Sequence, residues 1–175
     1  MTGRPRQRRQ SAGILLYRLP STVPTDDPAA GTRVPEVLLG HMGGPMWQRR
    51  DVGAWSIPKG GYTDEEDAFD AALREFEEEV GVRVPAEHFV DLGEVQQASG
   101  KFVRAWAAEG DLDPATAVSN TFEVEWPPGS GRLQPFPEFD RVAWFGPEEA
   151  MAKIVTAQAA FVERLLAALA ERPVT

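Results

Sequence analysis

The chain has 175 residues, of which 42% are hydrophobic, so it is long enough to bury the core of one domain. It contains no cysteine, which excludes a disulfide framework, a thiolate metal site and a cysteine nucleophile. Its formal net charge of −9 argues against nonspecific binding of nucleic acid over the whole surface.

The N-terminal residues MTGRPRQRRQ are basic and polar. We expect residues 1–10 to form a disordered, solubilising tail and residues 11–172 to form a single domain. The N-terminus lacks the apolar centre of a signal peptide, and no apolar run approaches the length of a membrane span. A cytoplasmic protein is therefore expected.

The first half of the chain alternates strand-like and loop-like segments. Apolar runs at residues 11–19 and 36–42 predict strands, and a shorter strand is predicted at residues 54–57. The segments between them are rich in Pro, Gly and Asp, which predicts loops. After them, helical periodicity predicts a helix from about Asp64 to Val80.

The second half contains more strand-like runs and one long helical pattern. The strands are expected at residues 89–97, 101–107, 121–126 and 141–145. The turn at Ser99-Gly100 would join the first two as a hairpin. From Pro147 to Leu169, apolar residues recur at helical spacing, which predicts one helix that covers a face of the sheet.

The predicted middle helix carries a high density of acidic side chains. Between Asp64 and Glu79 there are nine acidic residues and a single base, Arg74. At about 100° per residue, Glu75, Glu78 and Glu79 share one stripe, opposite the apolar stripe that should face the core. Like charges at this spacing repel, and hard oxygen ligands suit Mg²⁺ or Mn²⁺. A metal site and a solvated acidic face are the two interpretations.

The spacing of the whole segment favours the metal site. Gly60 is followed after five residues by Glu66, and after seven more by the run REFEEEVGV at residues 74–82. This pattern resembles the signature of the Nudix hydrolases in every fixed position. Phe76 stands where an aliphatic residue is more usual, but it remains apolar and on the core side.

The resemblance implies an α/β fold, namely the Nudix α/β/α sandwich with a mixed central sheet. It also implies a hydrolase that cleaves a nucleoside diphosphate linked to another group. By the same resemblance, Glu75, Glu78 and Glu79 bind Mg²⁺ (or Mn²⁺) ions that bridge phosphate oxygens and activate water. Arg74 is expected to orient the glutamates through charge-assisted hydrogen bonds.

A further glutamate is expected in the reaction. The family often supplies one from a loop just before a strand that carries a tryptophan, as an extra metal ligand or general base. Glu138, six residues before Trp144, fits that description. Glu123 and Glu125 compete with it because their alternation places them on one strand face. A surface glutamate is the alternative for all three.

The segment that carries the Nudix signature, residues 60–82, is called the box below. Contacts to substrate phosphates are predicted at its start. Lys59 precedes Gly60-Gly61, whose missing side chains would let the backbone approach a phosphate. Arg50 is a further candidate, and other bases would join if their loops converge: Arg49, Lys101 and Arg104. Glu66 is interpreted as a residue that fixes the loop at the helix start.

Residues outside the box narrow the substrate only partly. Gln97 stands where the ADP-ribose group has proline, and Ser99 where diadenosine polyphosphate enzymes have tyrosine. WSIPKGG resembles some diadenosine polyphosphate and inositol pyrophosphate hydrolases. Residues 119–145 resemble a bacterial subgroup of predicted nucleoside triphosphate pyrophosphohydrolases. Four tryptophans could stack on a base, although core packing is the commoner role: Trp47, Trp55, Trp106 and Trp126.

Two classes of function follow. The first is Mg²⁺-dependent hydrolysis of a pyrophosphate bond in an NTP, a dNTP or a dinucleoside polyphosphate, with an inositol pyrophosphate as the alternative substrate class. The second is a Nudix domain that senses a ligand or binds a protein without turnover. The intact glutamate trio favours the enzyme. The expected partners are a small-molecule substrate and a second copy in a homodimer, with neither nucleic acid nor membrane.

Overall fold

The computed structural model describes residues 8–20 and 33–172 and contains a seven-stranded main sheet. Its strands are β1 (Gln10–Arg18), β2 (Glu36–Met42), β3 (Trp55–Ser56), β4 (Lys59–Gly61), β5 (Phe89–Gln96), β6 (Phe102–Glu109) and β9 (Phe139–Phe145). Their order is β3-β2-β1-β6-β5, with β4 also paired to β1 and β9 to β2. Strands β1 and β6 run parallel and the other pairs antiparallel, so the sheet is mixed, as predicted.

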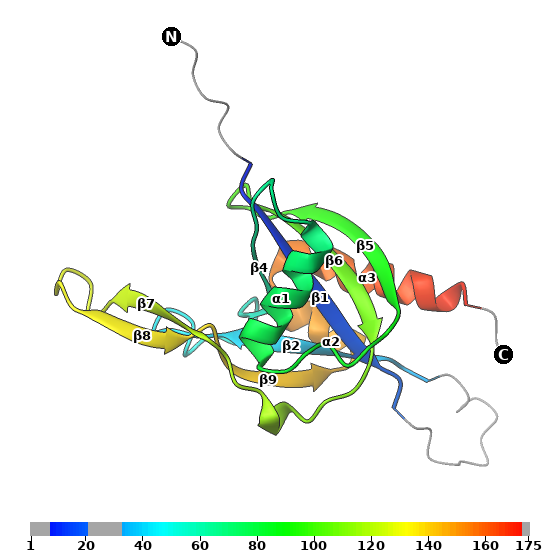
Figure 1. The fold of residues 1–175 in the computed structure, drawn as a ribbon. Coiled ribbons are helices and arrows are strands. Elements are labelled where there is room, and N and C mark those ends of the chain that lie inside the picture. Colours follow the sequence, from blue (N-terminus) through cyan, green and yellow to red (C-terminus); the bar gives the residue numbers. More distant parts are fainter. Residues whose placement is uncertain (1–7, 21–32, 173–175) are drawn as a thin grey trace, which may run out of the picture.

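Helices cover both faces of this sheet (Figure 1). Helix α1 (Ala68–Val80) lies on one face, and α2 (Pro147–Lys153) and α3 (Ala159–Ala170) lie on the other. Strand β1 separates two cores because successive side chains point to opposite faces. Ile14 packs on the α1 side and Leu15 on the α3 side, and both are fully buried. The predicted α/β/α sandwich is confirmed.

Local sequence explains where α1 begins and ends. The Asp67 side chain accepts hydrogen bonds from the backbone N–H groups of Phe69 and Asp70, which makes it the N-cap. Gly81 ends the helix with φ of 85°, a conformation that suits glycine. The helix was predicted to start at about Asp64, but it starts at Ala68. The reason is that Asp67 caps the helix, and a capping residue lies just outside the first turn.

The prediction of one long C-terminal helix is wrong. Helix α2 ends at Lys153, and the short 3₁₀ helix η3 (Thr156–Gln158) precedes α3. At the break, Ile154 forms a β-bridge with Trp55, and the Val155 N–H donates to the Trp55 carbonyl at 2.8 Å. The β-branched pair Ile154-Val155 suits this extended backbone, so pairing with β3 outweighs the helical periodicity.

Two strands were not predicted. Strand β4 lies inside the box loop, where Gly60-Gly61 suggested a turn. Strand β8 (Leu133–Pro137) contains two prolines, which the strand pattern disfavours. It pairs antiparallel with β7 (Thr121–Glu125) in a separate two-stranded sheet, where neither strand has a second neighbour. This hairpin projects from the body of the protein (Figure 1).

The predicted N-terminal tail is described only at its end, since residues 1–7 lie outside the described residues. Strand β1 begins at Gln10, one residue before the predicted start of the domain. The Arg8 guanidinium lies over the Phe102 ring, 3.6 Å from its centroid. Within residues 8–20 and 33–172, every helix is too short or too polar to cross a bilayer.

Candidate active site

Strand β4 lies over the acidic stripe of α1 and buries two of its carboxylates. Glu75 is 9% exposed and Glu79 is 7% exposed, although the periodicity of the helix suggested an outer stripe. The cause is a contact that is remote in sequence. A Cβ atom on Gly60 would lie 1.9 Å from a carboxylate oxygen of Glu75, so only glycine admits this carboxylate.

The Glu79 carboxylate is held at the base of the site. Its Oε2 accepts a hydrogen bond from the Lys59 backbone N–H at 2.9 Å. Burial raises the pKa of Glu79 to about 8; the Lys59 charge and N–H oppose this rise, and the charges of Glu138 and Glu75 add to it. The site therefore holds a carboxylate whose negative charge is costly without a nearby cation.

Arg74 joins the remaining acidic groups. Its Nε donates to Glu66 at 2.9 Å, and its Nη1 donates to Glu75 at 2.6 Å. The same Nη1 lies 3.3 Å from the half-exposed Glu78, and Nη2 lies 3.3 Å from the Gly61 carbonyl. The hydrogen bond from Arg74 lowers the pKa of Glu66. Glu66 thus fixes the loop through Arg74, as the sequence suggested.

Burial also raises the pKa of Glu75, and the adjacent Arg74 guanidinium opposes this rise. Glu75 and Glu78 share one guanidinium nitrogen, so their carboxylates are neighbours. In the described part of the chain, no three acidic or histidine side chains converge on one point as a ready-made metal site. The donor set nevertheless suits Mg²⁺, because buried carboxylate oxygens are its preferred protein ligands.

Replacing Gly60 by Ala should lower kcat by about 10- to 100-fold with little loss of stability, as expected for misplacing a catalytic group. The added Cβ would displace the Glu75 carboxylate, which is the mobile end of its side chain. Steady-state kinetics and thermal unfolding test this. The control is Gly100→Ala, in an open turn with φ of 79°, where strain arises without any effect on Glu75. Equal kinetic effects of the two variants would contradict the prediction.

Glu138 lies close enough to Glu79 for the two charges to interact. It connects β8 to β9; its N–H donates to the Asn120 carbonyl at 2.9 Å, and its carbonyl accepts from the Gly43 N–H at 2.8 Å. Its negative charge contributes to the raised pKa of Glu79. The competing residues Glu123 and Glu125 are exposed on the projecting hairpin.

The predicted basic residues separate into two groups. Lys101 is near the site, since burial lowers its pKa and the charges of Glu79 and Glu75 oppose this effect. By contrast, Arg104 pairs with Asp91 at 2.5 Å, and the exposed Arg50 lies over the Trp47 ring at 5.4 Å. The sequence named Lys101 only among the bases that would contact a phosphate if their loops converge, because no motif contains it.

His41 of β2 connects the loop that carries Arg50 to strand β9. It is fully buried. Its Nδ1 lies 2.9 Å from the Asp140 carboxylate, and its Nε2 lies 2.6 Å from the Arg50 carbonyl. Both partners accept hydrogen bonds, so the imidazole connects the loop that carries Arg50 to the start of β9, two residues after Glu138.

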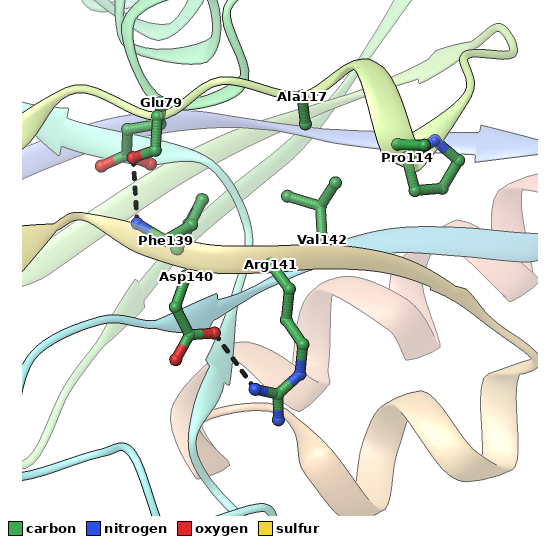
Figure 2. A pocket seen from close by; sticks show the side chains of 9 residues that line it. Glu79, Pro114, Ala117, Phe139, Asp140, Arg141 and Val142 are labelled. Carbon is green, nitrogen blue, oxygen red and sulfur yellow. Dashed lines mark hydrogen bonds and ion pairs between the residues drawn. The ribbon is translucent and has the colours of Figure 1, made fainter.

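A pocket of about 360 Å³ opens next to Glu79. Figure 2 shows Glu79 near one end of the pocket and β9 as one wall, with the Asp140 and Arg141 side chains on the other side of this strand from Glu79. The opposite wall comes from the segment that carries Pro114 and Ala117. A group bound here would lie next to the buried Glu79 carboxylate.

Comparison with known proteins agrees with this architecture. The family model for the NUDIX domain matches residues 29–165. A search of curated proteins gave no match. Among solved structures, a C. elegans Ap4A hydrolase binary complex is 22% identical over 93% of this chain and 99% of its own, with a TM-score of 0.59.

Two bacterial structures have similar TM-scores at lower sequence identity. A mutT/nudix family protein from Listeria innocua is 16% identical, covers 95% of this chain and 97% of its own, and has a TM-score of 0.59. The NUDIX domain of Shewanella oneidensis NrtR, complexed with ADP ribose, is 14% identical over 94% of this chain and 90% of its own, with a TM-score of 0.57. At these identities the likeness shows the fold.

Proposed function

Because the chain belongs to the Nudix family and is a pyrophosphohydrolase, we propose that it hydrolyses a nucleoside diphosphate derivative in a Mg²⁺-dependent reaction on the acidic face of α1. The observation that carries this proposal is the burial of Glu75 and Glu79 beneath β4. Burying two adjacent carboxylates costs free energy, and a solvated acidic surface would avoid that cost. A bound divalent ion would offset that cost.

The proposed ligands are Glu75, Glu78 and Glu79, and Mn²⁺ would serve in place of Mg²⁺. When bound, the metal would neutralise phosphate charge and lower the pKa of an attacking water. Pyrophosphate hydrolysis needs this help because both the phosphoryl group and the leaving group are negatively charged.

The chain's own groups position these parts. The backbone N–H of Lys59 fixes Glu79, and Arg74 holds Glu75 and Glu78 side by side. We propose that Gly60 and Gly61 bind a phosphate through the β4 backbone, which is open at Gly61, where a Cβ would meet only the Gln10 carbonyl oxygen at 3.9 Å, while the Glu75 carboxylate fills the Cβ position of Gly60. The Lys59 and Lys101 side chains place positive charge near Glu79, where they would attract a polyphosphate. Arg50 is proposed as a phosphate ligand at the outer edge of the site.

A substrate panel tests the proposal. It contains NTPs, dNTPs, dinucleoside polyphosphates, ADP-ribose and inositol pyrophosphates, each assayed with Mg²⁺, with Mn²⁺ and with EDTA. Turnover of at least one nucleotide that EDTA abolishes is the expected result. Turnover of inositol pyrophosphates alone would replace the substrate class. No turnover of any member would support the alternative, a ligand-sensing or protein-binding module.

Replacing Glu138 by Gln should lower kcat by about 10- to 100-fold and change KM little. We propose that Glu138 acts as general base or as an extra metal ligand, since its charge reaches Glu79. The amide keeps the shape but cannot accept a proton. Steady-state kinetics of this variant and of Glu123→Gln, the exposed control, measure the effect. Unchanged turnover in Glu138→Gln would remove this residue from the mechanism.

Several accompanying predictions concern the setting of the enzyme. A cytoplasmic location, a homodimer, a disordered tail over residues 1–10 and the absence of nucleic-acid binding remain predictions from sequence. Light scattering with size-exclusion chromatography measures the mass in solution and so decides between monomer and dimer.

A further inference from the structure

An apolar slot lies between the β7–β8 hairpin and the loop that follows β2. Its volume is about 160 Å³, and its walls include Met46, Trp47, Phe122, Val124 and Trp126. Of the residues that line the slot, Glu125 alone is charged. The volume is well below the roughly 300 Å³ at which pockets for drug-sized ligands begin, so the slot has room for a single flat ring system.

The hairpin presents an apolar face to this slot. Along β7, Phe122 and Val124 are half-buried, as is Trp126 just after the strand. The alternate residues Thr121, Glu123 and Glu125 are exposed. Phe122 also pairs with Phe136 across the hairpin, with ring centroids 6.4 Å apart. Neither Phe122 nor Trp126 belongs to the two buried cores, so these rings are available without unpacking the domain.

Two glycines bring the loop against the hairpin. A Cβ on Gly43 would lie 1.8 Å from the Pro137 carbonyl oxygen, and Gly44 has φ of 90° with its Cβ position 3.1 Å from the Phe122 ring. Larger residues at either place would push the two walls apart. Glycine at these two positions therefore lets the loop and the hairpin lie close enough for their side chains to form the slot.

Backbone hydrogen bonds link both walls of the slot to residues of the candidate active site. The Gly43 N–H donates to the Glu138 carbonyl, and the Glu138 N–H donates to the Asn120 carbonyl. Asn120, just before β7, in turn donates to the Glu78 carbonyl at 2.9 Å. Backbone hydrogen bonds thus connect the hairpin and the loop to Glu78 and Glu138. The guanidinium of Arg50, 5.4 Å from the Trp47 ring centroid, adds a positive charge at the edge.

We infer that this slot binds the nucleobase of the substrate, which makes Trp126, Phe122 and Trp47 determinants of specificity for base-bearing polyphosphates. This inference rests on the proposed function, because it places the phosphates on α1. Aromatic rings stack on the face of any base, so the slot selects nucleotides over base-free polyphosphates without strict choice among bases. Inositol pyrophosphates, which lack a flat ring, are then poor substrates.

Binding of AMP and of ribose 5-phosphate, followed by calorimetry without metal, tests the inference in the full chain. AMP should bind at least ten-fold more tightly than ribose 5-phosphate. Trp126→Ser should weaken AMP binding by about ten-fold or more, the loss expected for one stacked base. Leu133→Ser is the matched control, because Leu133 is 64% exposed and pairs with Glu125 on the outer face of the same hairpin.

Kinetics supply the second readout. Trp126→Ser should raise KM for ATP, and Leu133→Ser should leave that KM unchanged. If Trp126→Ser unfolds the hairpin, seen as lost near-ultraviolet dichroism, Phe122→Leu replaces it with the same expectation. Equal affinity for AMP and ribose 5-phosphate, or equal effects of Trp126→Ser and Leu133→Ser, would overturn the inference. Base-dependent binding without any Mg²⁺-dependent turnover would instead support the slot and refute the proposed function.

Discussion

Replacing Glu79 by Gln is expected to lower kcat about a thousandfold while the fold remains intact. This loss corresponds to about 4 kcal/mol of activation free energy, the scale of one metal-dependent stabilisation of charge. Glutamine keeps the acceptor that the Lys59 N–H requires at 2.9 Å, but it removes a negative charge from a buried position. Thermal stability without metal should therefore be unchanged or higher.

Glu77→Gln is the matched control for this variant. Glu77 belongs to the same helix, but its side chain is 54% exposed and lies 3.8 Å from Arg83 at the surface. Its substitution should change neither kcat nor stability beyond about 0.5 kcal/mol, as is usual for surface positions. A Glu79→Gln enzyme with the turnover of the Glu77→Gln enzyme would exclude Glu79 from the reaction.

Replacing Arg74 by Ala should destabilise the protein by about 2–3 kcal/mol and also reduce kcat strongly. Removal of one partner of a buried ion pair typically costs 3–5 kcal/mol, and the value here is lower because the Arg74 side chain is 39% exposed. The variant leaves Glu75 buried without its hydrogen-bond partner and Glu66 without its anchor. Arg74→Lys should restore little, because lysine lacks the planar fork that joins these groups.

Denaturant unfolding with and without Mg²⁺ separates the two roles of Arg74. Added Mg²⁺ should reduce the stability deficit of Arg74→Ala, because a bound cation replaces the missing charge beside Glu75. Arg83→Ala is the control, since that side chain is 89% exposed and its nearest acidic partner is Glu77. Equal destabilisation by Arg74→Ala and Arg83→Ala would contradict the network described for Arg74.

The sequence predicted those parts of the fold that depend on local pattern. The box segment indicated the family and the helix, and a continuous apolar run indicated β2 with its observed bounds of Glu36–Met42. The failures occur where distant contacts decide the structure. Strand β8 forms despite Pro135 and Pro137 because it pairs with β7 alone. The C-terminal helix breaks at Ile154 because that residue pairs with Trp55.

In the candidate site, too, the sequence predicted what depends on local spacing and missed what depends on contacts between elements. Helical spacing placed Glu75, Glu78 and Glu79 on one stripe, but it could not show that β4 buries two of them. That burial depends on Gly60 lying against Glu75 across the fold, a contact between two elements. The nearness of Lys101 to the carboxylates follows from the pairing of β6 with β1 and was likewise not readable from spacing.

We propose that the glutamates of α1 bind a divalent ion against a polyphosphate. Calorimetric titration of Mg²⁺ into the protein saturated with a non-hydrolysable, methylene-bridged nucleotide tests it most directly. We expect saturable binding to the natural sequence and to Glu77→Gln, and its loss in the combined Glu75→Gln, Glu78→Gln and Glu79→Gln variant. Retention of the same Mg²⁺ affinity in that folded triple variant would contradict it.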